Sequence, residues 1–238
     1  MKNLFFFLLT VVLFNSCESE TEPIVFQTQT IEEPYRADIT ATFDQVKGNG
    51  NLSEKFNQNI EKGILSAINN GENKNTLKEA LKSFDEEYKS FIADFSETDP
   101  KWELHVETEI TYKSDEIITL AISSYEFKGG AHGNDKINFL NLNAKTGAII
   151  DQKELLKDVN NFKYLAKEHF IKSIQADDNG LSMEDYFFGK PFQLPENIGL
   201  SDDGLILLYN VYEVASYDQG YTEFLIPFED VLPYLNFN

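Results

Sequence analysis

A strict alternation of apolar and polar residues between positions 102 and 112 constrains the fold of this chain more than any other feature. One set of alternate residues is Trp102, Leu104, Val106, Thr108, Ile110 and Tyr112, and the other is Glu103, His105, Glu107, Glu109 and Thr111. Successive side chains of a β-strand point to opposite faces of its sheet. The pattern therefore predicts a strand with one buried face and one acidic face. After the turn "KSDE", residues 117–127 ("IITLAISSYEF") are expected to form its antiparallel partner.

Two amphipathic helices are predicted before this strand. The first has apolar residues every four positions from Phe56 to Ile68, with Ser53 placed to cap its start and Gly71 to close its end. The second lies in residues 76–95 and has the same periodicity. Its apolar positions are Leu77, Leu81, Phe84, Tyr88, Phe91 and Phe95.

The rest of the chain mixes hairpins with short helices. Residues 137–143 and 148–150 are predicted as strands around the turn "AKTG". Asp151 is expected to cap a short helix that ends at Leu156, and residues 162–174 a longer one. Further strands are expected in "PFQL", "LILLYNVYEV" and "YTEFLIPF". Because the strands come as hairpins, the predicted class is α+β, an antiparallel or mixed sheet packed by helices on one face, in two intertwined or adjacent lobes.

The first residues have the pattern of a secretory signal. Lys2 precedes an uncharged apolar run at positions 4–14, which is too short for a membrane-spanning helix of roughly 20 residues. Ser16 and Cys17 follow, and Cys17 is the only cysteine. This arrangement resembles a bacterial lipoprotein signal, in which residues 1–16 are removed and Cys17 is lipidated. The mature chain would have 238 − 16 = 222 residues and could form no internal disulfide.

An acidic tether is predicted for residues 17–34. It contains "ESETE" directly after Cys17 and "IEE" at residues 31–33. Such a polar segment is expected to be extended and solvated. The acidic stretch also resembles the surface-export signal of some Gram-negative lipoproteins. The expected location is therefore the outer membrane or cell surface of a Gram-negative bacterium, after secretion across the inner membrane.

The chain carries a formal net charge of −20, from Lys+Arg 20 against Asp+Glu 40. Removal of Lys2 with the signal would make it 19 − 40 = −21. A surface of this charge repels nucleic acid and anionic lipid headgroups and attracts cationic partners over a long range. We therefore expect no nucleic-acid partner. The plain alternative is that the charge serves solubility alone.

The loop "GGAHGN" is the stretch where chemistry was most to be expected. It lacks the spacing of a dinucleotide fingerprint and the "GK[ST]" of a phosphate loop, and "GxSxG" is absent from the chain. The histidines of the chain form neither "HxxxH" nor "HExxH", so no metal, cofactor or catalytic residue is predicted. The loop is interpreted as a turn in which Gly129, Gly130 and Gly133 allow positive φ and close backbone approach around His132.

Residues 209–228 form a second dense stretch, rich in tyrosine and acidic residues. Tyrosine beside carboxylates suits a basic protein partner. The alternative is that these are core tyrosines joined to a hairpin tip. In the binding interpretation, His132 and its glycines shape one loop, and a neighbouring tip is formed by Glu213, Tyr217, Asp218 and Tyr221.

Three ordered motifs together resemble the RsiV/PdaC-like extracytoplasmic domains. They are "GGAHGN", "NLNAKTG" and the run from "FQL" through "GLILLYNVYEVASYDQGYTEFLIPFEDVLPYL". The resemblance assigns residues 35–127 to a PdaC-like half and residues 128–238 to an RsiV-like half. It implies an α+β fold and a role at the cell envelope. One relative is an anti-sigma factor whose outer domain binds lysozyme, a strongly basic protein; the other is a peptidoglycan deacetylase with a separate catalytic domain.

Departures from both relatives shape the functional expectation. No sigma-binding segment or spanning helix is seen, and "TFDQ" at residues 42–45 lacks the second Asp of the deacetylase "TFDD". At residues 215–217 "ASY" stands where the family often reads "APY". We expect a non-enzymatic, lipid-anchored envelope protein that binds lysozyme, another basic protein or peptidoglycan through an acidic surface. The alternatives are an N-deacetylase-like enzyme, with a metal site built around His132 and carboxylates, and a structural envelope lipoprotein.

Overall fold

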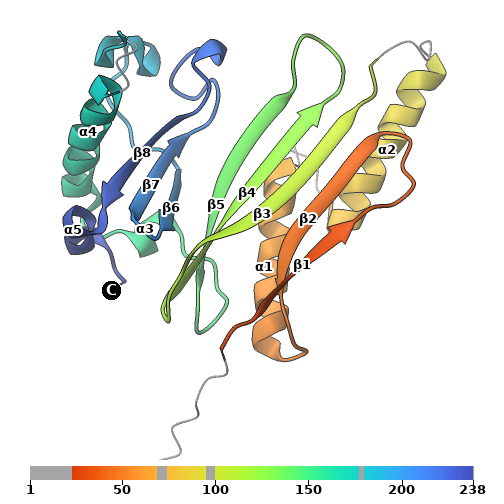
Figure 1. Ribbon diagram of the computed structural model, residues 1–238, viewed down its shortest axis with the longest axis horizontal. Helices are drawn as coiled ribbons and strands as arrows, with labels where there is room; N and C mark the ends of the chain where they lie inside the picture. Colours follow the sequence, from red (N-terminus) through yellow and green to blue (C-terminus); the bar gives the residue numbers. More distant parts are fainter. Residues whose placement is uncertain (1–22, 69–73, 95–99, 177–179, 238) are drawn as a thin grey trace, which may run out of the picture.

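The computed structural model describes residues 23–68, 74–94, 100–176 and 180–237. The predicted signal, Cys17 and the helix-closing Gly71 lie outside these ranges. The described residues form two sheets with helices packed on them, which confirms the predicted α+β class (Figure 1). Within the same ranges, no helix combines the length and the apolar character that crossing a membrane requires.

The larger sheet has five strands in the order β1-β2-β3-β4-β5. Strands β2 and β3 run parallel, whereas all other neighbours are antiparallel. The parallel pair follows from its connection, because helices α1 and α2 join β2 to β3 and both cover one face of the sheet (Figure 1). The bounds are β1 Phe26–Ile31, β2 Asp38–Val46, α1 Asn51–Ile68, α2 Leu77–Asp94, β3 Glu103–Lys113, β4 Ile117–Phe127 and β5 Asn134–Asn143.

Burial explains which residues of these strands face the helices. Ile39, Ala41, Leu104, Val106 and Ile122 are all at most 6% exposed and belong to one core with the apolar stripes of α1 and α2. This is the face that the sequence alternation assigned to the interior from Trp102 to Ile110. The prediction was wrong for Tyr112, because a register shift between Ile110 and Tyr112 turns that side chain to the second core, where it packs on Phe228. The opposite face of the same strands carries no helix. At one end β6 packs on it, where Thr111 and Asn141 donate to the carbonyls of Leu200 and Ile198, and the rest is left open.

The smaller sheet has three antiparallel strands and its own core. Phe170 lies at the centre of this core, and its ring centroid is 5.2 to 6.2 Å from those of the surrounding aromatic rings. Asp151 caps the short helix α3 as predicted, because its side chain accepts from the backbone N–H groups of Lys153 and Glu154. The bounds are α3 Gln152–Leu155, α4 Val159–Ala176, η1 Met183–Asp185, η2 Phe187–Gly189, β6 Asn197–Ser201, β7 Gly204–Tyr209, η3 Tyr217–Gln219, β8 Thr222–Pro227, α5 Phe228–Val231 and η4 Leu232–Tyr234.

Side-chain amides join the two sheets where β6 lies beside the edge strand β5. The Asn197 amide oxygen accepts from the backbone N–H of Phe139 at 2.7 Å, and its nitrogen donates to the carbonyl of Ile137 at 2.6 Å. Asn210 repeats this arrangement on the N–H and carbonyl of Ile137, at 2.9 and 3.0 Å. A Cβ on Gly199 would stand 2.3 Å from the Phe139 ring, so only glycine fits this crossing. These hydrogen bonds of Asn197 and Asn210 form the amide joint, which holds the smaller sheet beside the end of the open face.

The first described residues differ from the sequence prediction. Residues 26–31, assigned to the tether, form β1, which pairs with β2 from Phe26↔Val46 to Ile31↔Ala41. The segment "FQTQTI" has the alternation of a strand. It was predicted as tether because acidic residues lie on both sides of it. Helix α1 begins at Asn51, so Ser53 lies inside its first turn and accepts a hydrogen bond from the Gly50 N–H at 3.1 Å.

The second half also differs at several boundaries. Residues 148–150 contribute one bridge, Leu142↔Ile149, rather than a strand. The segment "PFQL" is not a strand, and the strand lies a few residues later, in β6. Strand β7 ends at Tyr209, because the chain turns at Tyr212, whose φ is 69°. Strand β5 belongs to the larger sheet, so the expected boundary between residues 127 and 128 falls inside one sheet.

Candidate binding face of the larger sheet

The strand register aligns polar side chains into rows on the open face. In one row Thr40 pairs with His105, His105 with Tyr125, and Tyr125 with Asp135. In the next row the partners are Thr42, Glu107, Ser123 and Ile137. Residues directly opposite one another on neighbouring strands are close enough for their side chains to interact. The rows therefore form one continuous polar surface across β2, β3, β4 and β5.

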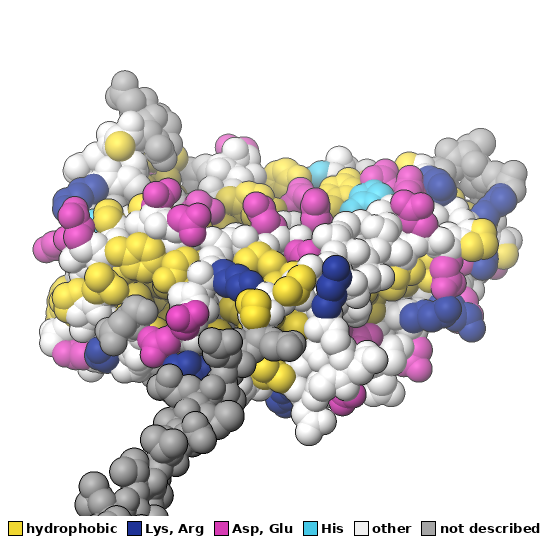
Figure 2. All heavy atoms as spheres, turned by 60° about the horizontal axis from the view of Figure 1, so that its bottom comes forward, with side chains coloured by type: hydrophobic (Ala, Val, Ile, Leu, Met, Phe, Trp, Pro, Cys, Tyr) yellow, Lys and Arg dark blue, Asp and Glu magenta, His cyan; other side chains and the backbone are white. Residues whose placement is uncertain are grey.

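Carboxylates are the dominant charged groups of this open face. The strand positions that share it carry Asp38, Asp44, Glu103, Glu107, Glu109 and Asp135, and among these strand positions none is Lys or Arg. Figure 2 shows acidic side chains recurring along the upper edge of the molecule, between hydrophobic groups and beside histidine. The strand positions of this face therefore contribute negative formal charge and no positive formal charge.

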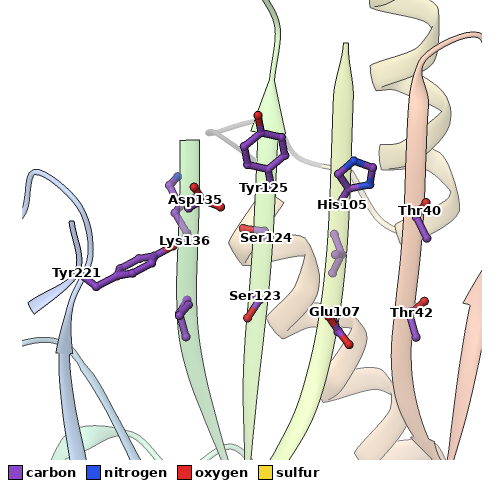
Figure 3. A pocket seen from close by; sticks show the side chains of 12 residues that line it. Thr40, Thr42, His105, Glu107, Ser123, Ser124, Tyr125, Asp135, Lys136 and Tyr221 are labelled. Atoms are coloured by element: carbon purple, nitrogen blue, oxygen red, sulfur yellow. The ribbon is translucent and has the colours of Figure 1, made fainter. Parts of the chain in front are cut away.

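The open face is hollowed near its centre. This depression, called here the sheet hollow, has a volume of about 540 Å³. Tyr221, from the loop before β8, points toward β5 and lines the edge of the hollow, so both halves of the chain contribute to it (Figure 3). Its lining residues include Thr40, Thr42, His105, Glu107, Ser123, Tyr125, Asp135, Lys136, Ile137 and Tyr221.

Tyr125 stands at the centre of the hollow and is held there by its neighbours. Its ring stacks on that of His105, with centroids 6.1 Å apart and planes inclined by 9°. The His105 Nε2 lies 3.6 Å from a carboxylate oxygen of Glu103. On the other side, a Cβ on Gly133 would stand 2.2 Å from the Tyr125 ring. Gly133 is therefore a glycine because the tyrosine ring fills the space of a side chain.

A second aromatic stack borders the hollow and joins the two loops. The rings of His132 and Tyr217 are stacked with centroids 4.0 Å apart, and Tyr212 packs on Tyr217 at 5.4 Å. All three side chains are exposed, Tyr217 to 38% and Tyr212 to 57%. Rigid aromatic side chains that keep part of their surface in water are typical anchors for a binding partner.

The ionisation of two tyrosines reflects the negative charge around them. Burial, together with the nearby carboxylates of Glu103 and Asp135, raises the pKa of Tyr125 above its usual value. Burial, with Asp135 and Tyr217 nearby, raises the pKa of Tyr221 to about 12. Both phenols therefore stay protonated at neutral pH and can donate hydrogen bonds. Asp135 lies close enough to act on both.

Two family models match consecutive parts of the chain. The model described as "Deacetylase PdaC" matches residues 35–135, and the model described as "Protein of unknown function (DUF3298)" matches residues 127–229. The two matched ranges are called the PdaC segment and the DUF3298 segment. The two matches confirm the resemblance drawn from the three motifs and indicate an extracytoplasmic domain family of unknown function. The segments overlap at residues 127–135, which comprise the end of β4, the loop that carries His132 and the first two residues of β5.

Two solved structures share this fold. A DUF3298 family member from Bacteroides fragilis has 18% sequence identity and a TM-score of 0.70, over 90% of this chain and 94% of that one. A DUF3298 family protein from Pseudomonas aeruginosa has 17% identity and a TM-score of 0.63, over 90% and 95% of the two chains. At these identities the likeness establishes the fold alone. Among curated protein sequences, no significant match was found.

The structure brings some of the predicted site residues together. His132 of the overlap loop and Tyr217 of the DUF3298 segment are in direct contact, and Tyr221 enters the adjacent hollow. Gly129 and Gly130 have φ of 85° and 111°, so they provide the positive φ expected of the turn. These contacts place the two predicted loops side by side.

Other predicted residues serve their own turns. A Glu213 carboxylate oxygen accepts from the backbone N–H of Asn210 at 2.8 Å, and Glu213 lines a separate small pocket. Asp218 accepts a hydrogen bond from the Ser216 hydroxyl at 2.5 Å. The prediction overlooked Tyr125, His105 and Asp135 as site residues. The alternation already placed His105 on the polar face, but only the strand register shows that the three form one row.

The histidines of the described segments do not converge on a metal centre. His105 and His132 belong to different aromatic pairs, and His169 on α4 lies 3.2 Å from a carboxylate oxygen of Asp230. Across residues 23–68, 74–94, 100–176 and 180–237, no three His, Cys, Asp or Glu side chains are grouped to hold a metal ion. The site thus offers carboxylates, phenols and ring faces, which suit recognition of a cation.

Proposed function

We propose that this protein is a non-enzymatic binding protein of the cell envelope, held by a lipid at Cys17, and that its open face binds a cationic protein. The single observation that carries the proposal is the set of carboxylates on that face, where the strand positions include no lysine or arginine. Complementary potentials speed association and exclude partners of like charge. Lysozyme, as a strongly basic protein, is the specific partner that the family resemblance implies.

The geometry of the face supports protein binding in two further ways. The face is broad, extending over β2 to β5, and its rim carries the stacked rings of His132, Tyr217 and Tyr212. Tyrosine is over-represented among the residues that dominate binding energy at protein interfaces. A partner seated on the carboxylates would therefore meet aromatic anchors from the DUF3298 segment.

Calorimetry of the mature chain with lysozyme at low and high salt tests the proposal. We expect saturable binding at low salt that weakens as salt screens the charges. A variant carrying Glu103→Gln, Glu107→Gln and Glu109→Gln should lose most of the affinity. A control with the same change in charge elsewhere, Glu168→Gln, Asp202→Asn and Glu229→Gln, should keep it; these three residues are exposed. Absence of binding by the wild-type chain at low salt would refute the lysozyme assignment.

The anchor and the location require their own test. Metabolic labelling with a fatty-acid analogue should mark the wild-type protein and not a Cys17→Ser variant. Fractionation should then find the wild-type protein with the outer membrane, and protease added to intact cells should cleave it if it is displayed at the surface. Labelling that survives Cys17→Ser would contradict lipidation at this residue.

A second candidate function is removal of N-acetyl groups from wall sugars. The description of the PdaC model favours it, although the described residues show no group of side chains that fits a metal ion. Metal analysis of the purified protein and measurement of amine release from acetylated wall fragments decide between the two. Amine release that tracks the wild-type protein would favour the enzyme over the binding protein.

A further inference from the structure

The sheet hollow contains polar groups that have no hydrogen-bond or ion-pair partner among the residues that the structure describes. Among the described residues, the carboxylates of Asp135 and Glu107 take part in no ion pair and no side-chain hydrogen bond, and the same holds for the hydroxyl groups of Tyr125 and Tyr221. Some carboxylates elsewhere do form ion pairs, such as that of Glu87, which lies 2.8 Å from the Lys128 ammonium. The hollow therefore presents hydrogen-bonding capacity to whatever enters it.

The arrangement of these groups is specific. Asp135 and Tyr125 are direct cross-strand neighbours in one row, and Tyr221 approaches Asp135 from the smaller sheet's side (Figure 3). Glu107 lies in the next row and two strands away, at the far end of the hollow. A volume of about 540 Å³ is within the roughly 300–1,000 Å³ typical of pockets for small ligand groups.

We propose that the sheet hollow is an anchor site for one arginine side chain of the protein partner, whose guanidinium pairs with Asp135 and packs on the rings of Tyr125 and Tyr221. This inference rests on the proposed function, since it specifies how the open face holds a cationic protein. A guanidinium is planar and weakly hydrated, pairs with a carboxylate through two parallel hydrogen bonds and stacks on aromatic faces. The hollow offers both a carboxylate and ring faces.

The remaining charged groups of the hollow fit this occupant. Glu107 adds negative charge at the far end, where the aliphatic stem or a second basic residue of the partner can lie. Lys136 lines the β5 edge, and His105 lies beside the Tyr125 ring with a Glu103 carboxylate oxygen 3.6 Å from its Nε2. A lysine ammonium would gain the carboxylate but little from the ring planes, because it is a compact, strongly hydrated charge. An anionic group would face Asp135 and Glu107 and be repelled.

The test uses Nα-acetyl-arginine amide, with the citrulline amide as a matched neutral analogue and the lysine amide as a second cation. In NMR titrations of the mature chain, the arginine compound should shift resonances of Tyr125 and Tyr221 saturably. The citrulline and lysine compounds should bind about tenfold more weakly or worse. Equal binding of the citrulline compound would overturn the assignment to a cation. Equal binding of the lysine compound would overturn the assignment to arginine.

Two variants locate the site on the face. Asp135→Asn should weaken binding of the arginine compound by about tenfold or more, because the carboxylate is replaced by a neutral amide of the same size. Asp202→Asn removes the same charge from the exposed turn between β6 and β7, outside the open face, and should leave that binding unchanged. Unchanged binding by Asp135→Asn, in a variant whose thermal unfolding matches the wild type, would overturn the proposal.

Lysozyme titrations with the same variants separate this inference from the proposed function. If the wild-type chain binds lysozyme and Asp135→Asn binds it equally well, the anchor site is refuted and the acidic face stands. If the arginine compound binds in the hollow while lysozyme and other basic proteins do not bind, the site is supported and the proposed function is refuted. Loss of both lysozyme and arginine binding in Asp135→Asn alone supports both.

Discussion

Gly133 and Tyr125 pack so closely that the tyrosine ring occupies the space of a glycine side chain. A Cβ at position 133 would stand 2.2 Å from the nearest ring atom, and no other described glycine except Gly204, which faces backbone, is approached so closely. The loop that contains His132 thus does more than turn the chain. It supports the ring that stands at the centre of the sheet hollow.

Gly133→Ala is expected to displace the Tyr125 ring without unfolding the protein. The ring is a side chain at a partly exposed position, so it can swing away, and we expect a loss of stability of about 1 kcal/mol, the low end for overpacking. The binding free energy for a cationic partner should fall by more than the free energy of unfolding does. Thermal unfolding and the ring resonances of Tyr125 check this. Gly50→Ala is the control, because nothing lies within 4 Å of its Cβ position; an equal effect of both variants would contradict the packing argument.

Tyr217→Ala is expected to weaken binding of a basic partner by about tenfold, which is about 1.4 kcal/mol, while thermal unfolding stays nearly unchanged. Tyr217 is stacked on His132, is in tilted contact with Tyr212 and is 38% exposed, so it contributes a rigid surface rather than core packing. Tyr164→Ala provides the matched control, because Tyr164 lies on α4 and is 71% exposed. Calorimetry with both variants measures the difference. Equal affinity of the two variants would remove Tyr217 from the interface.

The sequence was sufficient to predict which face of β3 packs on the helices as far as Ile110. The alternation from Trp102 to Tyr112 placed His105, Glu107 and Glu109 on the polar face, and the structure leaves that face open. The helix stripes led by Phe56 and Leu81 were equally clear, because both residues are fully buried in one core. Local periodicity decides these features, so a single sequence contains them.

The sequence did not contain the neighbours of each residue across the sheet. One row contains Thr40, His105, Tyr125 and Asp135, which come from strands separated by two helices and two turns. The alternation of a strand shows which face of the sheet a side chain lies on, but not which residue of the next strand lies beside it. Strand β6 was missed for a related reason. The strand begins at Asn197, whose side-chain amide hydrogen-bonds the backbone of β5, and asparagine is a residue type that sequence patterns assign to turns.

Asp85 is expected to make stability depend on pH in the acidic range. Its side chain is 3% exposed, accepts from the backbone N–H groups of Arg36 and Ala37 at 2.6 and 2.9 Å, and pairs with Lys89 at 2.5 Å. Burial alone would raise the pKa of Asp85, but these bonds outweigh it and the pKa lies below its usual value. The carboxylate is therefore more acidic when the protein is folded than when it is unfolded.

The sign of the effect follows from this lowered pKa. The stabilisation is fully present above the unfolded value of about 4 and is lost as pH falls through the folded value. At neutral pH, Asp85→Asn should lower the free energy of unfolding by roughly 1–3 kcal/mol, because a buried charge-assisted set of bonds is weakened. Denaturant unfolding from neutral pH down to about pH 3 should show the wild type and the variant converging. A difference that stays constant below about pH 4 would contradict the assignment.

The amide joint between the two sheets is expected to hold the smaller sheet in place. Asn197→Ala removes both hydrogen bonds to the β5 edge and leaves the Phe139 N–H and the Ile137 carbonyl with fewer partners. We expect a loss of roughly 1–3 kcal/mol and faster hydrogen exchange at the Phe139 amide. Asn210 still bonds Ile137 in this variant, so the sheets should remain associated. Asn160→Ala on the exposed first turn of α4 is the control and should change neither quantity. Because Tyr221 reaches the hollow from the smaller sheet's side, Asn197→Ala should also weaken binding of the partner. If hydrogen exchange at the Phe139 amide and partner binding were both unchanged, the joint would not position Tyr221.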